Sequence, residues 1–244
     1  MIPVQNPVPL RFPPVATWTL IAICTVVFLV ENSLDPGQLE LFLSRFALIP
    51  ARYLDSEPFG FDSVLDYLPF VTNMFLHGGW LHLILNMWML WLFGGAVEDR
   101  FGRVRYLAFY IACGIVASIT HAFFNATSTV PALGASGAIA GVLGAHIRMF
   151  PMARIVLVIP VLFFPFFFEL PAVVFVGIWF VTQLLQGTAE LFAPSTGGGI
   201  AWWAHIGGFV AGLLLTPALR RSSANYRPYY HDEGVLGFGP FGDR

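Results

Sequence analysis

The sequence ALGASGAIAGVLGAHIRM, residues 132–149, decides the fold of this chain. The run is mostly apolar, and a helix needs about 17 to 25 such residues to cross the hydrocarbon core of a bilayer. Its first turn places Ser136 in a bend of small residues, Gly134-Ala135-Ser136-Gly137. The run therefore predicts a membrane helix that carries a hydroxyl group near one end.

The composition of the whole chain supports a membrane protein. Hydrophobic residues make up 57% of it, charged residues only 11%, and the mean hydropathy is +0.74, which is far from the composition of a soluble globular domain. Five further apolar runs are long enough to span a bilayer. They cover residues 15–30, 81–97, 106–124, 171–192 and 200–219. The predicted fold class is an all-α polytopic bundle of six transmembrane helices.

A seventh apolar stretch, residues 155–168, is shorter and is interrupted by Pro160 and Pro165. At about 14 residues it is too short for an ordinary span. Its length and its prolines favour a re-entrant or interfacial segment over a full crossing.

The distribution of arginine predicts how the helices are oriented, because cytoplasmic loops collect basic residues. All twelve basic residues are arginines. Clusters of them follow the second, fourth and sixth runs, whereas the segments after the third and fifth runs contain none. Arg11 agrees with a cytoplasmic N-terminus, but Arg45 and Arg52 in the long loop after the first run do not follow this trend. This pattern predicts six spans with both ends of the chain in the cytoplasm. The first run lacks a cleavage site and is expected to be retained. The compact core and the arginine-only basic set favour a bacterial plasma membrane.

The expected organisation has three parts. Residues 1–14 form a cytoplasmic N-terminal segment, residues 15–219 form the six-span core, and residues 220–244 form a mobile cytoplasmic tail. Within the core, residues 31–80 are too long for a simple connection and are expected to fold on the outer membrane surface. Cys24 and Cys113 each lie alone in an apolar run, which favours buried free thiols over a disulfide.

Ser136 and His205 are predicted to lie at similar depth below the outer face. Ser136 starts the fourth run, and His205 lies one to two turns into the sixth, which begins from the same side. A serine hydroxyl is a poor nucleophile until a base such as histidine takes its proton. Considered alone, however, a serine or histidine in a membrane helix is commonly a packing or hydrogen-bonding residue.

Two stripes of small residues predict that the fourth and sixth runs pack against each other. The stripes comprise Gly137, Gly141 and Gly144 in one run and Ala204, Gly208 and Gly212 in the other. Such stripes let helix backbones approach closely in lipid. Close packing would place Ser136 and His205 side by side.

His82 and Asn86 lie four residues apart on one face of the second run. Polar side chains are costly in hydrocarbon, so they should face the protein interior or a water-filled cavity. Donors of this kind can stabilise a developing oxyanion, and the N–H of Ser136 at a helix start can add another. A polar clamp between helices is the alternative explanation.

Four motifs in this order resemble the rhomboid family of intramembrane serine proteases across the six runs. They are His-x-x-x-Asn (82–86), Glu-x-x-x-Gly (98–102), Gly-x-Ser-Gly (134–137) and Ala-His-x-x-Gly (204–208). The resemblance implies a Ser136 nucleophile and a His205 general base that act as a dyad without a carboxylate. It further implies oxyanion stabilisation by His82 and Asn86. The implied activity is endoproteolysis of transmembrane substrates near the outer face, through an acyl-enzyme.

The resemblance also suggests a lateral gate for the substrate. Trp179 looks like an aromatic residue of the family that packs near Leu85 of the second span, although a lipid-facing or core tryptophan is an equal alternative. Some members stack the catalytic histidine on an aromatic residue four positions after the serine. This chain has Ala140 there, which leaves the support of His205 unexplained.

The remaining histidines match no catalytic position of the family. His121 and His146 are expected to be packing or interface residues, and His77 either lines the path of water or belongs to a loop. No metal-binding motif is present, so the expected mechanism uses no metal and no organic cofactor. The expected partners are transmembrane protein substrates and membrane lipid, without nucleic acid.

Two functions from other classes compete with proteolysis. A catalytically inactive rhomboid-like protein would bind membrane clients, but such relatives typically lack the serine or the histidine. A channel or transporter would be favoured by paired carboxylates in the spans or by an internal repeat, and the sequence has neither. The substrate, the cleavage site and the oligomeric state are not determined by the sequence.

Overall fold

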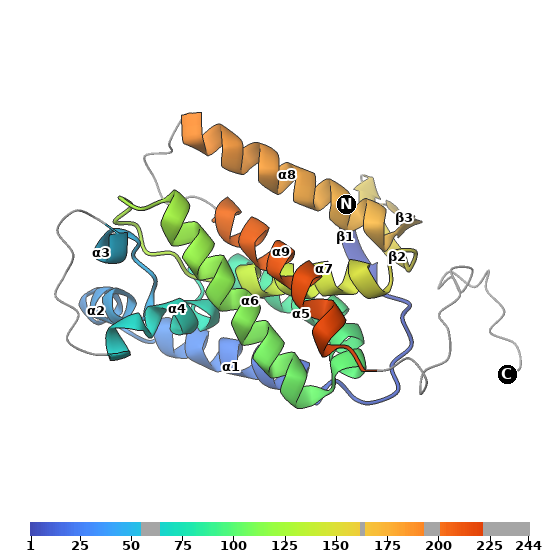
Figure 1. Cartoon of the computed structure of the whole chain (residues 1–244), viewed down its shortest axis with the longest axis horizontal. Helices are drawn as coiled ribbons and strands as arrows, with labels where there is room; N and C mark the ends of the chain where they lie inside the picture. Colours follow the sequence, from blue (N-terminus) through green and yellow to red (C-terminus); the bar gives the residue numbers. More distant parts are fainter. Residues whose placement is uncertain (55–63, 162–163, 193–200, 222–244) are drawn as a thin grey trace, which may run out of the picture.

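The computed structural model describes residues 1–54, 64–161, 164–192 and 201–221. Figure 1 shows a mostly helical molecule in which long helices lie side by side. The long helices correspond to the six apolar runs. They are α1 (Val15–Glu31), α5 (Trp80–Phe101), α6 (Arg103–Phe124), α7 (Ser136–Met149), α8 (Ala172–Phe192) and α9 (Trp202–Leu219).

Among the described residues, four helices are long and apolar enough to cross a membrane: α5, α6, α8 and α9. Helix α1 is apolar but has 17 residues, and α7 has 14. At a rise of about 1.5 Å per residue, α7 is about 21 Å long, which is shorter than the hydrocarbon core. It is surrounded by other helices, since every residue from Gly137 to His146 is buried.

Close packing of glycines joins α7 to α9, as the small-residue stripes predict. A Cβ atom placed on Gly208 would overlap the carbonyl oxygen of Gly137, and one placed on Gly212 would overlap that of Gly141. On the other side, a Cβ on Gly144 would collide with the backbone of Phe209. The two backbones are therefore in direct contact, which only small residues permit.

The all-α prediction is wrong for residues 155–168, where the described residues form β-strands. The stretch belongs to a β-hairpin of β2 (Arg154–Val161) and β3 (Phe164–Pro171), and β1 (Ile2–Gln5) pairs antiparallel with the far edge of β2. Figure 1 shows the sheet beside the end of α7 and the start of α8. The run is rich in valine, isoleucine and phenylalanine, which favour strands, and prolines exclude a helix interior.

The two ends of the hairpin differ in their contacts. Pro160 and Pro165 lie opposite each other near its tip. At its base, the guanidinium of Arg154 lies 3.7 Å from the carboxylate of Glu169. The prolines that prevent a helix are thus placed where the strands turn, and the stretch is neither a helical span nor an irregular re-entrant loop.

Short helices fill the region between α1 and α5. They are α2 (Pro36–Phe46), α3 (Ala51–Leu54), η1 (Val64–Tyr67), α4 (Pro69–Thr72) and η2 (Asn73–Phe75). This region is tied to the segment before α7, because Leu48 and Ala132 exchange backbone hydrogen bonds of 3.0 and 2.7 Å. The predicted mobile tail lies outside the described residues, except for Arg220 and Arg221.

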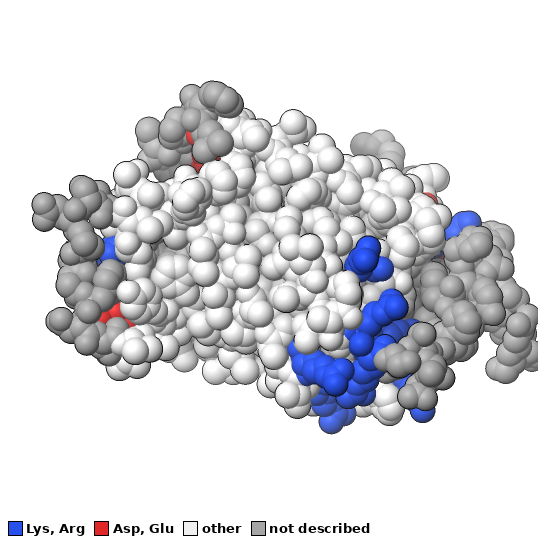
Figure 2. All heavy atoms as spheres, in the orientation of Figure 1, with Lys and Arg blue, Asp and Glu red and all other residues white. Residues whose placement is uncertain are grey.

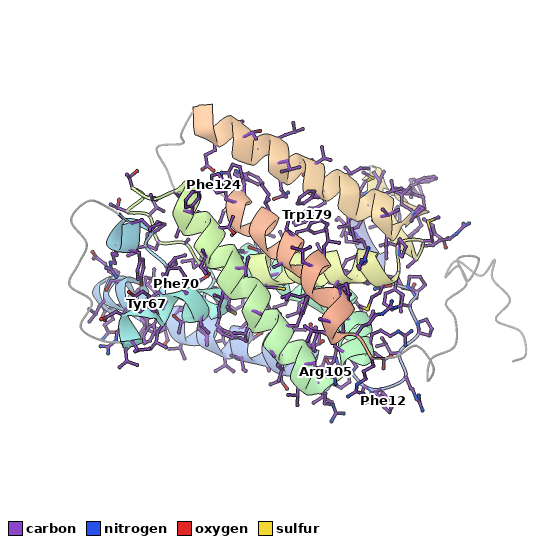
Figure 3. The ribbon with its side chains drawn as sticks, viewed as in Figure 1. Phe12, Tyr67, Phe70, Arg105, Phe124 and Trp179 are labelled. Atoms are coloured by element: carbon purple, nitrogen blue, oxygen red, sulfur yellow. The ribbon has the colours of Figure 1, made fainter. Side chains whose placement is uncertain are left out.

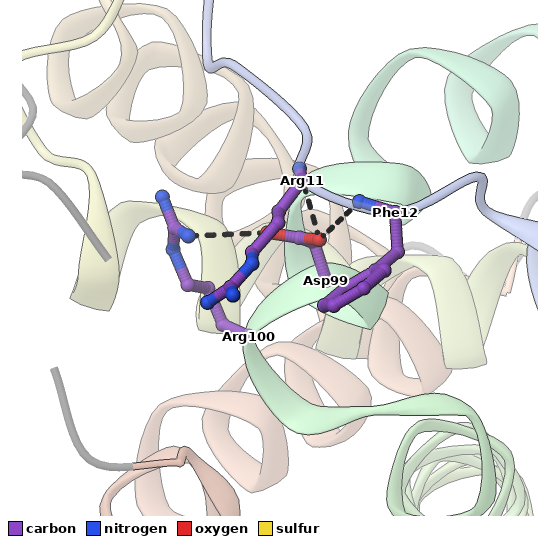
Figure 4. A network of polar contacts seen from close by, with 4 residues as sticks. All are labelled: Arg11, Phe12, Asp99 and Arg100. Carbon is purple, nitrogen blue, oxygen red and sulfur yellow. Dashed lines mark hydrogen bonds and ion pairs between the residues drawn. The ribbon is translucent and has the colours of Figure 1, made fainter. Parts of the chain in front are cut away.

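Two carboxylates at the end of α5 hold the chain that leads into α1. Glu98 accepts hydrogen bonds from the backbone N–H groups of Ala16 (2.9 Å) and Thr17 (2.7 Å), and from the Thr17 hydroxyl (2.8 Å). Asp99 accepts from the backbone N–H groups of Arg11 and Phe12 at 3.1 and 3.0 Å (Figure 4). The bonds to Glu98 satisfy backbone donors in the first turn of α1 that have no partner inside the helix, and the bonds to Asp99 hold the segment that precedes α1.

The loop from α5 to α6 is a single residue, Gly102, with φ of +78°. Side chains other than glycine rarely adopt this left-handed conformation. The Glu-x-x-x-Gly motif is therefore structural: its glutamate supports α1 and its glycine makes the turn.

Most of the described arginines gather at one end of the bundle (Figure 2), whereas Arg45 of α2 and Arg52 of α3 lie in the region of short helices. Arg100 lies in the last turn of α5, Arg103 begins α6, Arg148 lies in the last turn of α7, and Arg220 follows α9. Ser136 and His205 lie at the opposite ends of their helices, because α7 and α9 begin with the turns that carry them.

Candidate active site

Ser136 is the first residue of α7, and the chain reaches it through a strained turn. Gly134 has φ of +125°, and its N–H donates to the carbonyl oxygen of Asn73 at 2.9 Å. A Cβ atom on Gly134 would lie 2.8 Å from the ring of His82. Because Gly134 has no side chain, the backbone can adopt this turn and the imidazole of His82 can pack against it.

His205 lies in the first turn of α9, and its ring meets the hydroxyl of Ser136. The Nε2 atom lies 2.8 Å from the Oγ atom of Ser136, which is ordinary hydrogen-bond distance. The His205 side chain is buried. The two residues that the sequence places at one depth are thus in direct contact.

The other face of the His205 ring is held by α8. The Nδ1 atom lies 2.7 Å from the Oε1 atom of Gln183, and the ring of Trp179 lies 5.9 Å away at an interplanar angle of 38°. Gln183 and Trp179 therefore support the imidazole of His205, since Ala140 has no ring on which it could stack. Gln183 was not predicted from the sequence, although an amide one turn after Trp179 in an apolar helix was a usable signal.

His82 and Asn86 lie across the site on α5. The Nδ1 atom of His82 is 3.4 Å from the N–H of Gly78, which can donate to it. Asn86 is buried, and its Nδ2 atom has no hydrogen-bond partner within the described part of the chain. Leaving such a donor unsatisfied costs about 1 to 3 kcal/mol. Asn86 is therefore a candidate donor to a group that enters the site.

A cavity of about 1190 Å³ joins these side chains. It is lined by His82 and Asn86 of α5, Ser136 of α7, Trp179 of α8 and His205 of α9. Small-molecule sites usually have about 300 to 1,000 Å³. The cavity can therefore hold several residues of an extended peptide beside the hydroxyl.

The two candidate gate residues also line this cavity. The Trp179 side chain points from α8 toward α9 (Figure 3), where it lies against His205 and Phe209. Leu85 is 54% exposed on α5. Leu85 and Trp179 therefore border the same cavity. Their role as a gate for the substrate stays a prediction.

The three other histidines in the described part of the chain, His77, His121 and His146, occupy different environments. His121 also lines the cavity, with its ring 3.3 Å from the amide nitrogen of Asn125. His146 is fully buried against Phe93. The ring of His77 is buried beside His82.

His77 precedes α5 and lies outside the long helices. Burial, and to a lesser extent the charge of the neighbouring His82, lowers the pKa of His77 to about 4. His77 is therefore neutral at physiological pH and adds no charge beside the cavity. Among the described residues, no group of three or more metal-binding side chains is placed to hold an ion, and both cysteines are buried and free.

A sequence profile of the Rhomboid domain matches residues 65–222, which is more than half of the chain and includes every candidate site residue. The chain belongs to the rhomboid family. This confirms the resemblance carried by the four motifs.

Relatives within the rhomboid family come from several organisms. Presenilin-associated rhomboid-like protein A, mitochondrial, of Danio rerio is 34% identical over 46% of this chain and 30% of its own length. Rhomboid protein 1, mitochondrial, of Saccharomyces cerevisiae is 27% identical over 71% of this chain and 45% of its own length. Rhomboid protease GluP of Bacillus subtilis is 47% identical over 31% and 14%. The chain spans less than half the length of these relatives.

The predicted location in a bacterial plasma membrane is wrong by this comparison, because most of these rhomboid relatives are mitochondrial proteins. The physical reason is that the length of an apolar helix depends on the thickness of the bilayer. The distribution of arginines in the loops depends on which side of the membrane each loop occupies. Neither property distinguishes one cellular membrane from another.

Proposed function

We propose that this chain is an intramembrane serine endopeptidase that cleaves transmembrane proteins. The contact between His205 Nε2 and Ser136 Oγ at 2.8 Å carries the proposal. The unsatisfied Asn86 amide on the facing cavity wall supports it, because it supplies a donor where an oxyanion would form. Membership of the rhomboid family, which includes a relative named as a protease, agrees with this chemistry.

The reaction begins when a substrate carbonyl reaches the Ser136 hydroxyl. The oxygen of Ser136 bonds to the carbonyl carbon while His205 Nε2 takes the hydroxyl proton. The carbonyl oxygen becomes negatively charged, and donors from His82, Asn86 and the N–H at the start of α7 stabilise it.

Collapse of this intermediate breaks the peptide C–N bond. His205 returns its proton to the departing amine, which leaves an acyl ester on Ser136. A water molecule then attacks the ester, gives one proton to His205, and releases the carboxylate product as Ser136 recovers its hydroxyl. The cycle needs no redox partner. The serine proton ends on the new amine, a water proton restores the serine hydroxyl through His205, and the product acid gives its own proton to solvent.

The proposed membrane arrangement has six spans, with α1 and α7 crossing beside the four longer helices. Both ends of the core then lie on the arginine-rich side, and Ser136 opens toward the other. Residues 31–80 would cover that other side, and residues 1–14 and 220–244 would flank the core. The relatives favour a mitochondrial membrane.

Substrates would enter sideways, between α5 and α8, past Leu85 and Trp179. A stable helix hides its carbonyl groups in hydrogen bonds, so substrates with glycine or proline near the cut should be preferred. This preference follows from the need to expose a carbonyl group to Ser136.

Cleavage in proteoliposomes tests the proposed function. The purified chain would be reconstituted with single-span fusion proteins whose helices carry or lack a Gly-Pro pair near one end. We expect two fragments from the helix-breaking substrate with the wild-type chain, and an intact substrate with Ser136→Ala. Equal fragments from both proteins would show that another residue or a contaminant cuts. An inactive client-binding protein would instead retain the fusion proteins uncut.

A further inference from the structure

The amide of Gln183 is buried in a helix most of whose residues face outward. Only 22% of the apolar part of α8 is buried within the bundle, yet Gln183 is only 5% exposed. A polar group at this position is costly unless it is hydrogen-bonded. Its Oε1 atom meets that requirement at His205, 2.7 Å from Nδ1.

The hydrogen bonds of Gln183 fix which way its amide points. The Nε2 atom lies 3.3 Å from the carbonyl oxygen of Trp179 and 3.2 Å from the Oγ1 atom of Thr182. A carbonyl oxygen can only accept, so the amide nitrogen must face it. The amide oxygen therefore faces His205, where it can only accept a hydrogen bond.

This orientation determines the tautomer of His205. The proton of the neutral imidazole lies on Nδ1, because the oxygen of Gln183 offers it an acceptor. Nε2 then carries the lone pair, 2.8 Å from the Ser136 hydroxyl. The opposite tautomer would direct two acceptors at each other across 2.7 Å and would leave Nε2 unable to take the serine proton.

We propose that Gln183 is a positioning residue of the catalytic site, which orients His205 and selects the tautomer that makes Nε2 the base. It occupies the place that a carboxylate holds in a Ser-His-Asp triad, without adding a charge at this depth. The inference rests on the proposed function, since it concerns the base of that same reaction.

Two substitutions separate positioning from simple packing. Gln183→Met keeps the length and apolar stem of the side chain but removes the acceptor. Gln183→Glu keeps the acceptor and adds a charge. Gln186→Met is the matched control, because Gln186 lies on the exposed face of the same helix. The purified full chain would be treated with a fluorophosphonate probe, and the rate of labelling of Ser136 would be followed against pH.

The positioning role predicts slower labelling in Gln183→Met by about 10- to 100-fold, with an unchanged thermal midpoint, while Gln186→Met labels like wild type. In Gln183→Glu the carboxylate stabilises the protonated imidazole, so labelling recovers only at higher pH. The pH at which the labelling rate of Gln183→Glu falls on the acidic side should be higher than in wild type by about 1 to 3 pH units. The titratable groups that share the cavity with His205 are His82 of α5, His121 of α6 and Glu190 of α8, and they are the same in all variants.

A merely structural role predicts a different pattern. Labelling of Gln183→Met at the wild-type rate, or a Gln183→Glu profile that coincides with the wild-type profile, would overturn the inference. If Gln183→Met fails to fold, the profile of Gln183→Glu decides. Failure of the proposed function is distinguishable, because the wild-type chain would then not label at Ser136 at all.

Discussion

Gly208 of α9 lies directly against the carbonyl oxygen of Gly137 in α7, with no room for a side chain between them. The contact lies one turn from His205 along α9 and one residue from Ser136 along α7. The distance between Ser136, the proposed nucleophile, and His205, the proposed base, is therefore set by backbone packing.

Gly208→Ala tests this dependence. A methyl group at this position must push the two backbones apart, which costs about 1 to 3 kcal/mol. We expect a lower thermal midpoint and labelling of Ser136 at least tenfold slower. Gly177→Ala is the control, because a Cβ there meets nothing within 4 Å. Equal behaviour of the two variants would contradict the packing argument.

Glu98→Gln tests the support of α1. The carboxylate accepts three hydrogen bonds from Ala16 and Thr17, and hydrogen bonds to a charged group contribute about 1.5 to 3 kcal/mol. The variant should unfold at a lower temperature but keep its labelling rate while folded. Glu40→Gln, on the exposed side of α2, should match wild type. A normal midpoint for Glu98→Gln would show that these bonds add little.

Asn86→Ala tests oxyanion stabilisation. Removal of one oxyanion donor typically slows catalysis about 100- to 1,000-fold, so substrate cleavage should fall by that factor with little change in stability. Asn125→Ala serves as the control, because Asn125 lines the same cavity but bonds to His121. If both variants cleave equally well, Asn86 is a polar clamp between helices.

Leu85→Ala tests lateral access. A smaller side chain at the cavity rim should speed cleavage of a transmembrane substrate several-fold, whereas labelling by the small fluorophosphonate should stay constant. Ile84→Ala is matched to it, since Ile84 is equally exposed on α5 but does not line the cavity. An equal response of Leu85→Ala and Ile84→Ala would remove Leu85 from the gate.

The long helices and the contact between Ser136 and His205 could be predicted from the sequence, because bilayer thickness limits helix length and small residues mark close contacts. It did not predict the β-hairpin, because an apolar run without alternation does not distinguish a strand from a buried helix. It also missed the pairing partner of β2, which lies at Ile2–Gln5, far away in sequence. Gln183 escaped notice because its partner, His205, is on another helix.

The most direct measurement of the central claim is the site of fluorophosphonate attachment. The purified chain would be labelled and its modified residue identified by mass spectrometry, beside Ser136→Ala and His205→Ala. The account predicts a single adduct on Ser136 of the wild-type chain, none on Ser136→Ala, and labelling slowed by orders of magnitude in His205→Ala. Equal labelling of the wild-type chain and Ser136→Ala would contradict it.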